Sequence, residues 1–245
     1  MSLQNHLRKI ALASLLSVGA AFELVAFANE ELAKHNFNSQ GPILESMKDG
    51  SAFIEKMEKE IAKLDDYSLV FETRTFKKDK TVVERGKLFF KKPKQMRIEE
   101  IGEYNKGSVA VIGKDGKARA HGGGLTSFLT VTTKPDDHML DAANGDKMED
   151  SDFASLARIL QERLKSGQLC RVSEKPVQIE GVGELAYVLE IYHPNNPKAV
   201  LKRIYVHPET NLPLRWDDYD YKDPCLSIWK NVKANTGLAD DLFKL

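Results

Sequence analysis

Cysteine is scarce in this sequence: Cys170 and Cys225 are the only two, and they form no C-x-x-C pair. Zinc ribbons and thioredoxin-like redox sites are excluded, because both need closely spaced cysteines. In an oxidising compartment an even pair is a candidate for one disulfide. Spacing alone does not show whether the two Cα atoms come within bonding reach. A Cys170–Cys225 disulfide and two separate buried thiols therefore both stay open.

Signatures of catalysis are missing as well. The histidines form no H-E-x-x-H or H-x-H pair, there is no G-x-S-x-G elbow, and Gly122-Gly123-Gly124 lacks the Lys-Ser/Thr of a phosphate loop. His121, directly before these glycines, is the most suggestive histidine, although a strand-end histidine before a flexible loop is the simpler interpretation. We predict that the chain is not an enzyme and has no cofactor.

No spacing of ligands predicts a metal site. The acidic cluster Asp217, Asp218, Asp220 and Asp223 suggests calcium, but it lacks the glycine and terminal glutamate of an EF-hand loop. Charges often protect the exposed edge of a sheet. We expect a solvated strand edge here rather than a metal site.

Neither sign of charge is in excess: 36 basic and 36 acidic residues give a formal net charge of zero. Nucleic-acid binding needs a concentrated basic surface, so it is not expected. Two turns are basic, Lys77–Lys80 and the group Lys91, Lys92 and Lys94. They can meet an anionic membrane surface or an acidic partner, or be ordinary exposed hairpin turns.

The first 28 residues have the pattern of a signal peptide. Arg8 and Lys9 precede an apolar run from Ile10 to Ala26, which Glu23 interrupts, and Ala26-Phe27-Ala28 has the A-x-A form of a cleavage site. A buried helix or a membrane anchor is the alternative. We predict that residues 29–245 form a single periplasmic or secreted domain. No later run reaches the roughly 20 apolar residues needed to span a membrane.

Two helices and about eleven strands are predicted. Helical spacing of apolar residues covers Ser51–Leu64, with Ser51 as N-cap, and Ser151–Lys165, with Ser151 as N-cap. Residues 67–121 read as a meander of five strands and residues 169–232 as a meander of six, with Asp115-Gly116 as a tight hairpin turn. The segment 122–150 between them is irregular, although Leu125–Thr133 can form one more strand.

This pattern predicts a mostly antiparallel α+β fold. One sheet of so many strands curls strongly, and its concave apolar face must be covered. The two helices have apolar stripes that cannot stay in water. We therefore expect an unclosed, strongly curved barrel with the helices as a lid or plug.

Two hairpins in this pattern resemble the LolA/LolB superfamily of bacterial envelope proteins, which includes RseB and LppX. Residues 86–99 are similar to its Lys-x-Pro hairpin, and residues 203–215 to its D-x-x-T-x-L-P hairpin, with His207 where Asp is usual. The tail Asn235–Phe243 is similar to that of a secreted subfamily without an established activity. The resemblance implies a helical lid over an apolar cavity that binds lipids or lipoprotein acyl chains, as an analogy from fold.

Apolar side chains of the expected inner face are the candidates for lining such a cavity. Strand alternation and helical spacing select Phe53, Met57, Ile61, Leu69, Phe71, Leu88, Phe90, Met96, Ile98, Tyr187, Leu189, Ile191, Ile204, Leu214 and Trp216. The sequence does not distinguish a filled core from a hollow one. Two functions follow: a binding protein for a lipid, acyl chain or lipidated protein, or an envelope sensor that binds a protein partner.

Overall fold

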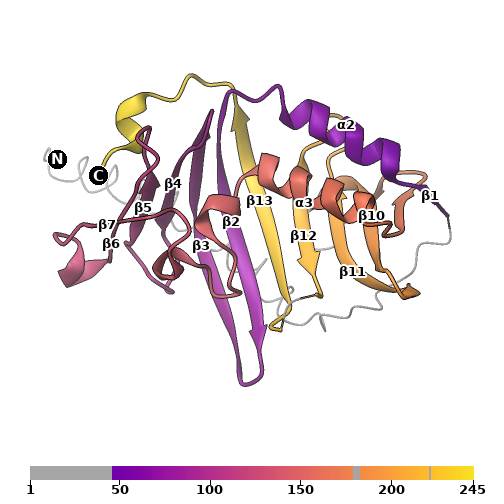
Figure 1. Cartoon of the computed structure of the whole chain (residues 1–245), viewed down its shortest axis with the longest axis horizontal. Coiled ribbons are helices and arrows are strands. Elements are labelled where there is room, and N and C mark those ends of the chain that lie inside the picture. Colours follow the sequence, from indigo (N-terminus) through magenta and orange to yellow (C-terminus); the bar gives the residue numbers. More distant parts are fainter. Residues whose placement is uncertain (1–45, 179–182, 221) are drawn as a thin grey trace, which may run out of the picture. The chain divides into compact units, whose positions relative to one another are not determined.

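The computed structural model describes residues 46–178, 183–220 and 222–245. The predicted signal peptide lies outside these residues. The described residues belong to one compact unit, and Figure 1 shows its strands with two helices lying across them.

Within the described residues one antiparallel sheet of thirteen strands forms the framework, two more strands than the sequence predicts. Twelve strands follow the order β1-β8-β10-β11-β12-β13-β2-β3-β4-β5-β6-β7, and β9 pairs with β10. The strands are β1 (Met47–Asp49), β2 (Asp66–Lys77), β3 (Lys80–Lys91), β4 (Gln95–Glu100), β5 (Val109–Ile112), β6 (Ala118–His121), β7 (Val131–Thr133), β8 (Cys170–Ser173), β9 (Val177–Gln178), β10 (Leu185–His193), β11 (Asn196–Val206), β12 (Pro213–Asp218) and β13 (Cys225–Ala234).

The sheet is curved and unclosed, which confirms the predicted fold class. Lys202 of β11 and Val131 of β7 line the same cavity, although eight strand steps separate their strands. At about 4.8 Å per step a flat sheet would place these strands roughly 38 Å apart. The sheet therefore curls around its inner face, and β1 and β7 do not pair to close it.

The two helices pack against the inner face. Helix α2 (Ser51–Ile61) contributes Ile54, Met57 and Ile61 to the core, and α3 (Phe153–Lys165) contributes Phe153, Ala157 and Leu160. Figure 1 shows α2 above α3, and both cross the strands. The helices therefore fill part of the curve, as the sequence predicts.

Both predicted N-caps are displaced by one residue. Gly50 precedes α2 without a side-chain cap, and Ser51 is already helical. Asp152 rather than Ser151 caps α3, where its Oδ1 accepts hydrogen bonds from the N–H groups of Ala154 and Ser155 at 3.0 and 3.1 Å. A carboxylate is a strong cap because it also complements the positive end of the helix dipole.

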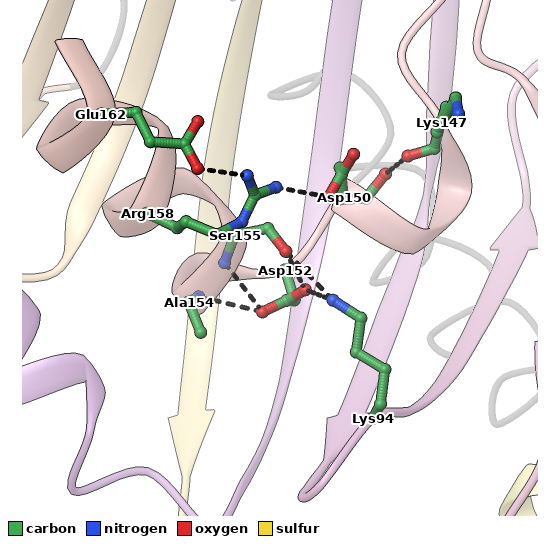
Figure 2. Close-up of polar contacts among 9 residues, drawn as sticks. Lys94, Lys147, Asp150, Asp152, Ala154, Ser155, Arg158 and Glu162 are labelled. Carbon is green, nitrogen blue, oxygen red and sulfur yellow. Dashed lines mark hydrogen bonds and ion pairs between the residues drawn. The ribbon is translucent and has the colours of Figure 1, made fainter. Parts of the chain in front are cut away.

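The start of α3 is anchored to the sheet by charge and by aromatic packing. Lys94 Nζ lies 2.5 Å from Asp152 Oδ2 and donates to Ser155 Oγ at 3.0 Å (Figure 2). The Tyr67 hydroxyl accepts a hydrogen bond from Phe153 N–H at 2.9 Å, and the two rings stack with centroids 4.8 Å apart. These contacts hold α3 over β2.

The C-terminal motif has a structural role. The Asp66 carboxylate accepts hydrogen bonds from the backbone N–H groups of Thr236, Gly237 and Leu238 at 2.8–3.2 Å. Asn235, in the left-handed region at φ 53°, accepts a bond from Asp65 N–H at 2.7 Å. The tail Asn235–Phe243, which carries part of the sequence resemblance, thus fastens the end of β13 to the start of β2.

The side chain of His207 binds backbone N–H groups in the turn that follows it. Its Nδ1 accepts hydrogen bonds from the N–H groups of Glu209 and Thr210 at 3.2 and 3.3 Å. An aspartate carboxylate at the start of a turn bonds in the same way. The imidazole therefore replaces the Asp that the resembling hairpin usually has.

Candidate functional site

A cavity of about 830 Å³ lies between the inner face of the sheet and the segment 122–151. This volume falls within the range of about 300–1,000 Å³ that is typical of ligand pockets. The segment contains β7 and the short 3₁₀ turns Gly124–Thr126, His138–Leu140 and Met148–Asp150. Leu156, Ile159, Glu162 and Arg163 of α3 complete the cover.

One wall of the cavity is apolar. Phe71, Leu88, Ile98, Trp216 and Trp229 line it from five strands. On β3 the position opposite Phe71 is Gly86, where a Cβ would lie 2.5 Å from the Phe71 ring. The glycine thus lets the ring of Phe71 lie close to the sheet and leaves the space above it open.

The structure divides the predicted lining residues between a hollow and a filled region. Phe71, Leu88, Ile98 and Trp216 line the cavity, and they also belong to the hydrophobic core or pack against it. The other predicted positions on the inner face are packed in the core or against it, and they are Phe53, Met57, Ile61, Leu69, Phe90, Met96, Tyr187, Leu189, Ile191 and Ile204. Strand alternation and helical spacing found the correct face for these positions, and the cover above that face decides which part is hollow.

Leu214 lies on the opposite face, so its prediction as a lining residue is wrong. The β11–β12 register shifts between Tyr205 and Val206, where Val206 pairs with Pro213 but Tyr205 pairs with Arg215. This bulge takes up one residue and reverses the side that Leu214 faces. Leu214 packs with Ala186 and Tyr205 in a separate small cluster.

Several lining residues were not predicted. Trp229 of β13 is one, because alternation favours Leu226 and Ile228 as the inner-facing residues of this strand, which is the opposite parity. Leu140 and Met148 are others, and they come from a segment with no regular periodicity. The pairing of β13 with β2, in which Trp229 lies opposite Phe71, is the signal that could have identified the first.

The second wall of the cavity is polar and mostly acidic. Lys202 and Arg163 supply its positive charges, and each forms an ion pair. Lys202 pairs with Asp218 across neighbouring strands, and Arg163 Nη2 lies 2.8 Å from Asp220 Oδ2. Because β12 lies between β11 and β13, the interpretation of the acidic cluster as a solvated edge is wrong for the two aspartates of this strand, Asp217 and Asp218.

The aspartates of β12 alternate between the two faces, as strand geometry requires. Asp217 and Asp218 are both buried. Asp217 forms a two-point ion pair with Arg215 at 2.6 and 3.0 Å on the outer face, whereas Asp218 belongs to the cavity. No group of three or more side chains suited to a metal gathers in the part of the chain that the structure describes.

Glu84 of β3 and Glu100 of β4 lie beside each other on the polar wall. Glu100 pairs with Gly86, two residues from Glu84 on the same face of β3. Burial and the nearby Glu84 carboxylate raise the pKa of Glu100 to about 8, although the Arg85 backbone N–H partly offsets both effects. Burial also raises the pKa of Glu84, and Asp146 adds to this rise.

Two polar contacts fasten the covering segment to the sheet. The N–H of Ala143 donates to both oxygens of Glu84, at 3.0 and 3.2 Å. The side-chain amide of Asn144 donates to Cys225 Sγ at 3.1 Å. The middle of the cover is thus attached to β3 and to β13.

The cysteines are free and buried, so the alternative of two separate thiols holds. Cys170 belongs to β8 and Cys225 to β13, and β10, β11 and β12 lie between them in the sheet. Burial raises the pKa of each thiol to about 12. Neither thiol is a ready nucleophile, because the thiolate is the reactive form.

The glycine run is a site of close backbone packing. A Cβ at Gly123 would lie 1.8 Å from the Lys106 carbonyl oxygen, so only glycine fits beside the β4–β5 connection. His121 Nδ1 donates to the Gly122 carbonyl at 2.9 Å, and the residue lines the cavity.

The basic hairpin after β3 is engaged within the chain. Lys91 pairs with Asp240, and Lys92 donates to the Ala62 carbonyl at 2.7 Å. Lys94 binds the N-cap of α3, as described above. These contacts favour the ordinary hairpin turn over a docking patch.

The fold and its cavity define a class of protein: an open, curved β-sheet with a covered internal pocket. Among the described helices none has the length and hydropathy to cross a bilayer. No protein-family model matches the sequence, and no curated protein matches it.

Solved structures similar to this chain include a LolA superfamily protein from Nitrosomonas europaea, MucB, and lipoprotein LppX from Mycobacterium tuberculosis. The first is 11% identical, with a TM-score of 0.46, over 81% of this chain and 98% of that one. MucB is 14% identical, with a TM-score of 0.47, over 80% and 64%. LppX is 12% identical, with a TM-score of 0.44, over 78% and 97%. At these identities and TM-scores the likeness concerns the fold alone.

Proposed function

We propose that this protein is a binding protein that holds the apolar chain of a lipid or other amphiphile in the covered cavity, in the periplasm or outside the cell. The observation that carries the proposal is the cavity of about 830 Å³ with Phe71, Leu88, Ile98, Trp216 and Trp229 in its wall. Burial of a methylene group contributes about 0.8 kcal/mol. A chain of a dozen carbons therefore gives useful affinity after the cost of ordering it.

Entry to the cavity requires movement of its cover. The contacts of Ala143 with Glu84 and of Asn144 with Cys225 attach the cover at its middle. We propose that these contacts break when the ligand enters or leaves, while the sheet and α3 stay in place.

The test is uptake of a fluorescent fatty-acid analogue by the purified protein, together with native mass spectrometry of protein isolated without detergent. We expect saturable uptake, and an extra mass that solvent extraction resolves as an amphiphile. An apo mass combined with no uptake of the probe would contradict the proposal.

A cavity-filling variant makes this test specific. Ala110 lies on β5 in the cavity wall, so Ala110→Phe should weaken uptake and leave the fold intact. Ala154 is exposed on α3, and Ala154→Phe is the matched control that should bind as the wild type does.

A second function, docking of a protein partner, is favoured by exposed apolar side chains on the cover. Leu125 is 92% exposed and Phe128 is 78% exposed. Pull-down with Leu125→Ser and Phe128→Ser variants tests this candidate. Loss of a partner without loss of probe uptake would support it.

A further inference from the structure

The charge of the cavity wall restricts the ligand that it can hold. Among the described residues the cations of the wall are Lys202 and Arg163, and they are paired with Asp218 and Asp220. Neither Glu84 nor Glu100 forms an ion pair with any residue for which the structure gives a position. The uncompensated charge that the wall can present is therefore negative.

Glu84 and Glu100 have different hydrogen-bonding states. Glu84 is 5% exposed, and its oxygens accept the Ala143 N–H. Glu100 Oε2 is buried and accepts no hydrogen bond from the described residues. A buried carboxylate oxygen without a donor costs free energy, so a donor or a cation from a ligand would stabilise it.

We propose that the polar group of the bound amphiphile is a cation, an amine or ammonium, that contacts Glu84 and Glu100 while its apolar chain lies against Phe71, Leu88 and Ile98. This inference rests on the proposed function. The same wall disfavours carboxylate and phosphate groups, because they would add a like charge to a site from which water is partly excluded.

The neighbourhood of these carboxylates agrees with this ligand. Asp141 and Asp146 of the cover line the same cavity, and so does His121 of β6. The positive charge of Lys77, at the end of β2, lowers the pKa of Glu84. Burial and mutual repulsion hold the pKa of Glu100 near 8. A bound cation reverses that effect, because an opposite charge favours the ionised carboxylate.

The experiment compares three probes with the same chain: dodecylammonium, laurate and dodecyl maltoside, each titrated calorimetrically below its critical micelle concentration at pH 7. We expect dodecylammonium to bind on the order of tenfold more tightly than laurate, as charge-assisted hydrogen bonds are stronger than neutral ones. The Glu84→Gln/Glu100→Gln variant should lose this preference and keep its affinity for the neutral maltoside. The amide that replaces the Glu84 carboxylate retains an oxygen that can accept the Ala143 N–H.

A matched control has the same change of net charge outside the cavity. Glu103 and Glu209 are exposed, so the Glu103→Gln/Glu209→Gln variant should keep the full preference for dodecylammonium. The wild-type ratio of affinities tests the proposal by itself if the Glu84/Glu100 variant does not fold.

Three results would overturn the inference, and they separate it from the proposed function. Equal affinities for the three probes would leave the binding function intact and reject the cationic ligand. A preference that survives in the Glu84/Glu100 variant would reject these two residues as its source. Failure of all three probes to bind would reject both the ligand class and the binding function.

Discussion

The inner face of the sheet has a filled region and a hollow region, built from the same kind of strand. Under α2 and α3 the side chains of Leu189, Ile191 and Ile204 are fully buried in the core. On β3 and β4 Leu88 and Ile98 face a cavity instead. The two regions have the same alternation and similar residue types, so the difference comes from what covers them.

A helix supplies a continuous row of apolar side chains every three to four residues, which fills the groove beneath it. The irregular segment 122–151 supplies apolar side chains, such as Leu140 and Met148, without this regular spacing. It is held by polar contacts such as Ala143 with Glu84. Replacement of a helix by an irregular cover thus leaves space for a ligand. The predictions below test this comparison from the largest expected effect to the smallest.

Truncation of one side chain in each region should distinguish the filled region from the hollow region most clearly, by the loss of stability. Leu189→Ala removes a fully buried side chain and should lower the free energy of unfolding by about 2–5 kcal/mol. Ile98→Ala, which enlarges an existing cavity, should cost less than about 1.5 kcal/mol. Urea unfolding measures both, and equal losses would contradict the division.

Detachment of the cover should have a smaller effect on stability. Glu84→Ala removes the acceptor of the Ala143 N–H and should cost about 1–2 kcal/mol. Hydrogen exchange at Ala143 should accelerate, whereas exchange at Leu189 should not change. Acceleration at both positions would show that the cover and the core open together.

The ionisation of Glu100 predicts a pH dependence of the hollow region. Its pKa is about 8 in the folded protein, and in the unfolded chain it is near the ordinary value of about 4.3. The folded state therefore binds more protons between these values, so its stability falls as pH rises through this window. We expect the free energy of unfolding to fall by about 1 kcal/mol across this window. The effect is this small because the group is partly exposed and solvent screens its charge.

Glu100→Gln is the variant that isolates this effect. Its free energy of unfolding should change less between pH 5 and pH 8 than that of the wild type, measured by urea unfolding at each pH. Glu103→Gln, at an exposed position, should retain the wild-type slope. The same slope in all three proteins would assign the pH dependence to other groups.

The smallest effect is expected at the outer side of the cover. Leu125 is 92% exposed, so Leu125→Ser should change the unfolding free energy by no more than about 0.5 kcal/mol. Thermal unfolding at several protein concentrations measures this effect. A larger loss would show that the side chain is buried in solution.

Much of the framework could be predicted from the sequence, because it depends on local periodicity. The meanders, both helices and the inner face of β2, β3 and β4 follow from alternation and helical spacing. The three-residue strand β1 was missed because so few residues carry too weak a pattern. Strand β7 lies within Leu125–Thr133, where the sequence allows one more strand. The hollow region was not separable from the core, because volume depends on packing between distant segments.

The polar wall of the cavity likewise could not be predicted from local sequence. Alternation places Glu84 on the same face as Leu88, and Glu100 on the same face as Ile98, but nothing local shows that the two carboxylates are buried there. Their burial arises from the covering segment, which follows them in the chain by more than twenty residues. The bulge that turns Leu214 to the other face likewise depends on pairing with β11.

The pairing of β13 with β2 has a consequence for how the chain folds. Thr73 and Ser227 face each other with a hydrogen bond between hydroxyls at 2.8 Å, 154 positions apart in sequence. Contacts of such long range slow folding, because the loop must close before they contribute. Strand β2 must therefore wait, with one edge unpaired, until β13 is available to pair with it. A chaperone that shields this edge would be expected to increase the yield of the protein.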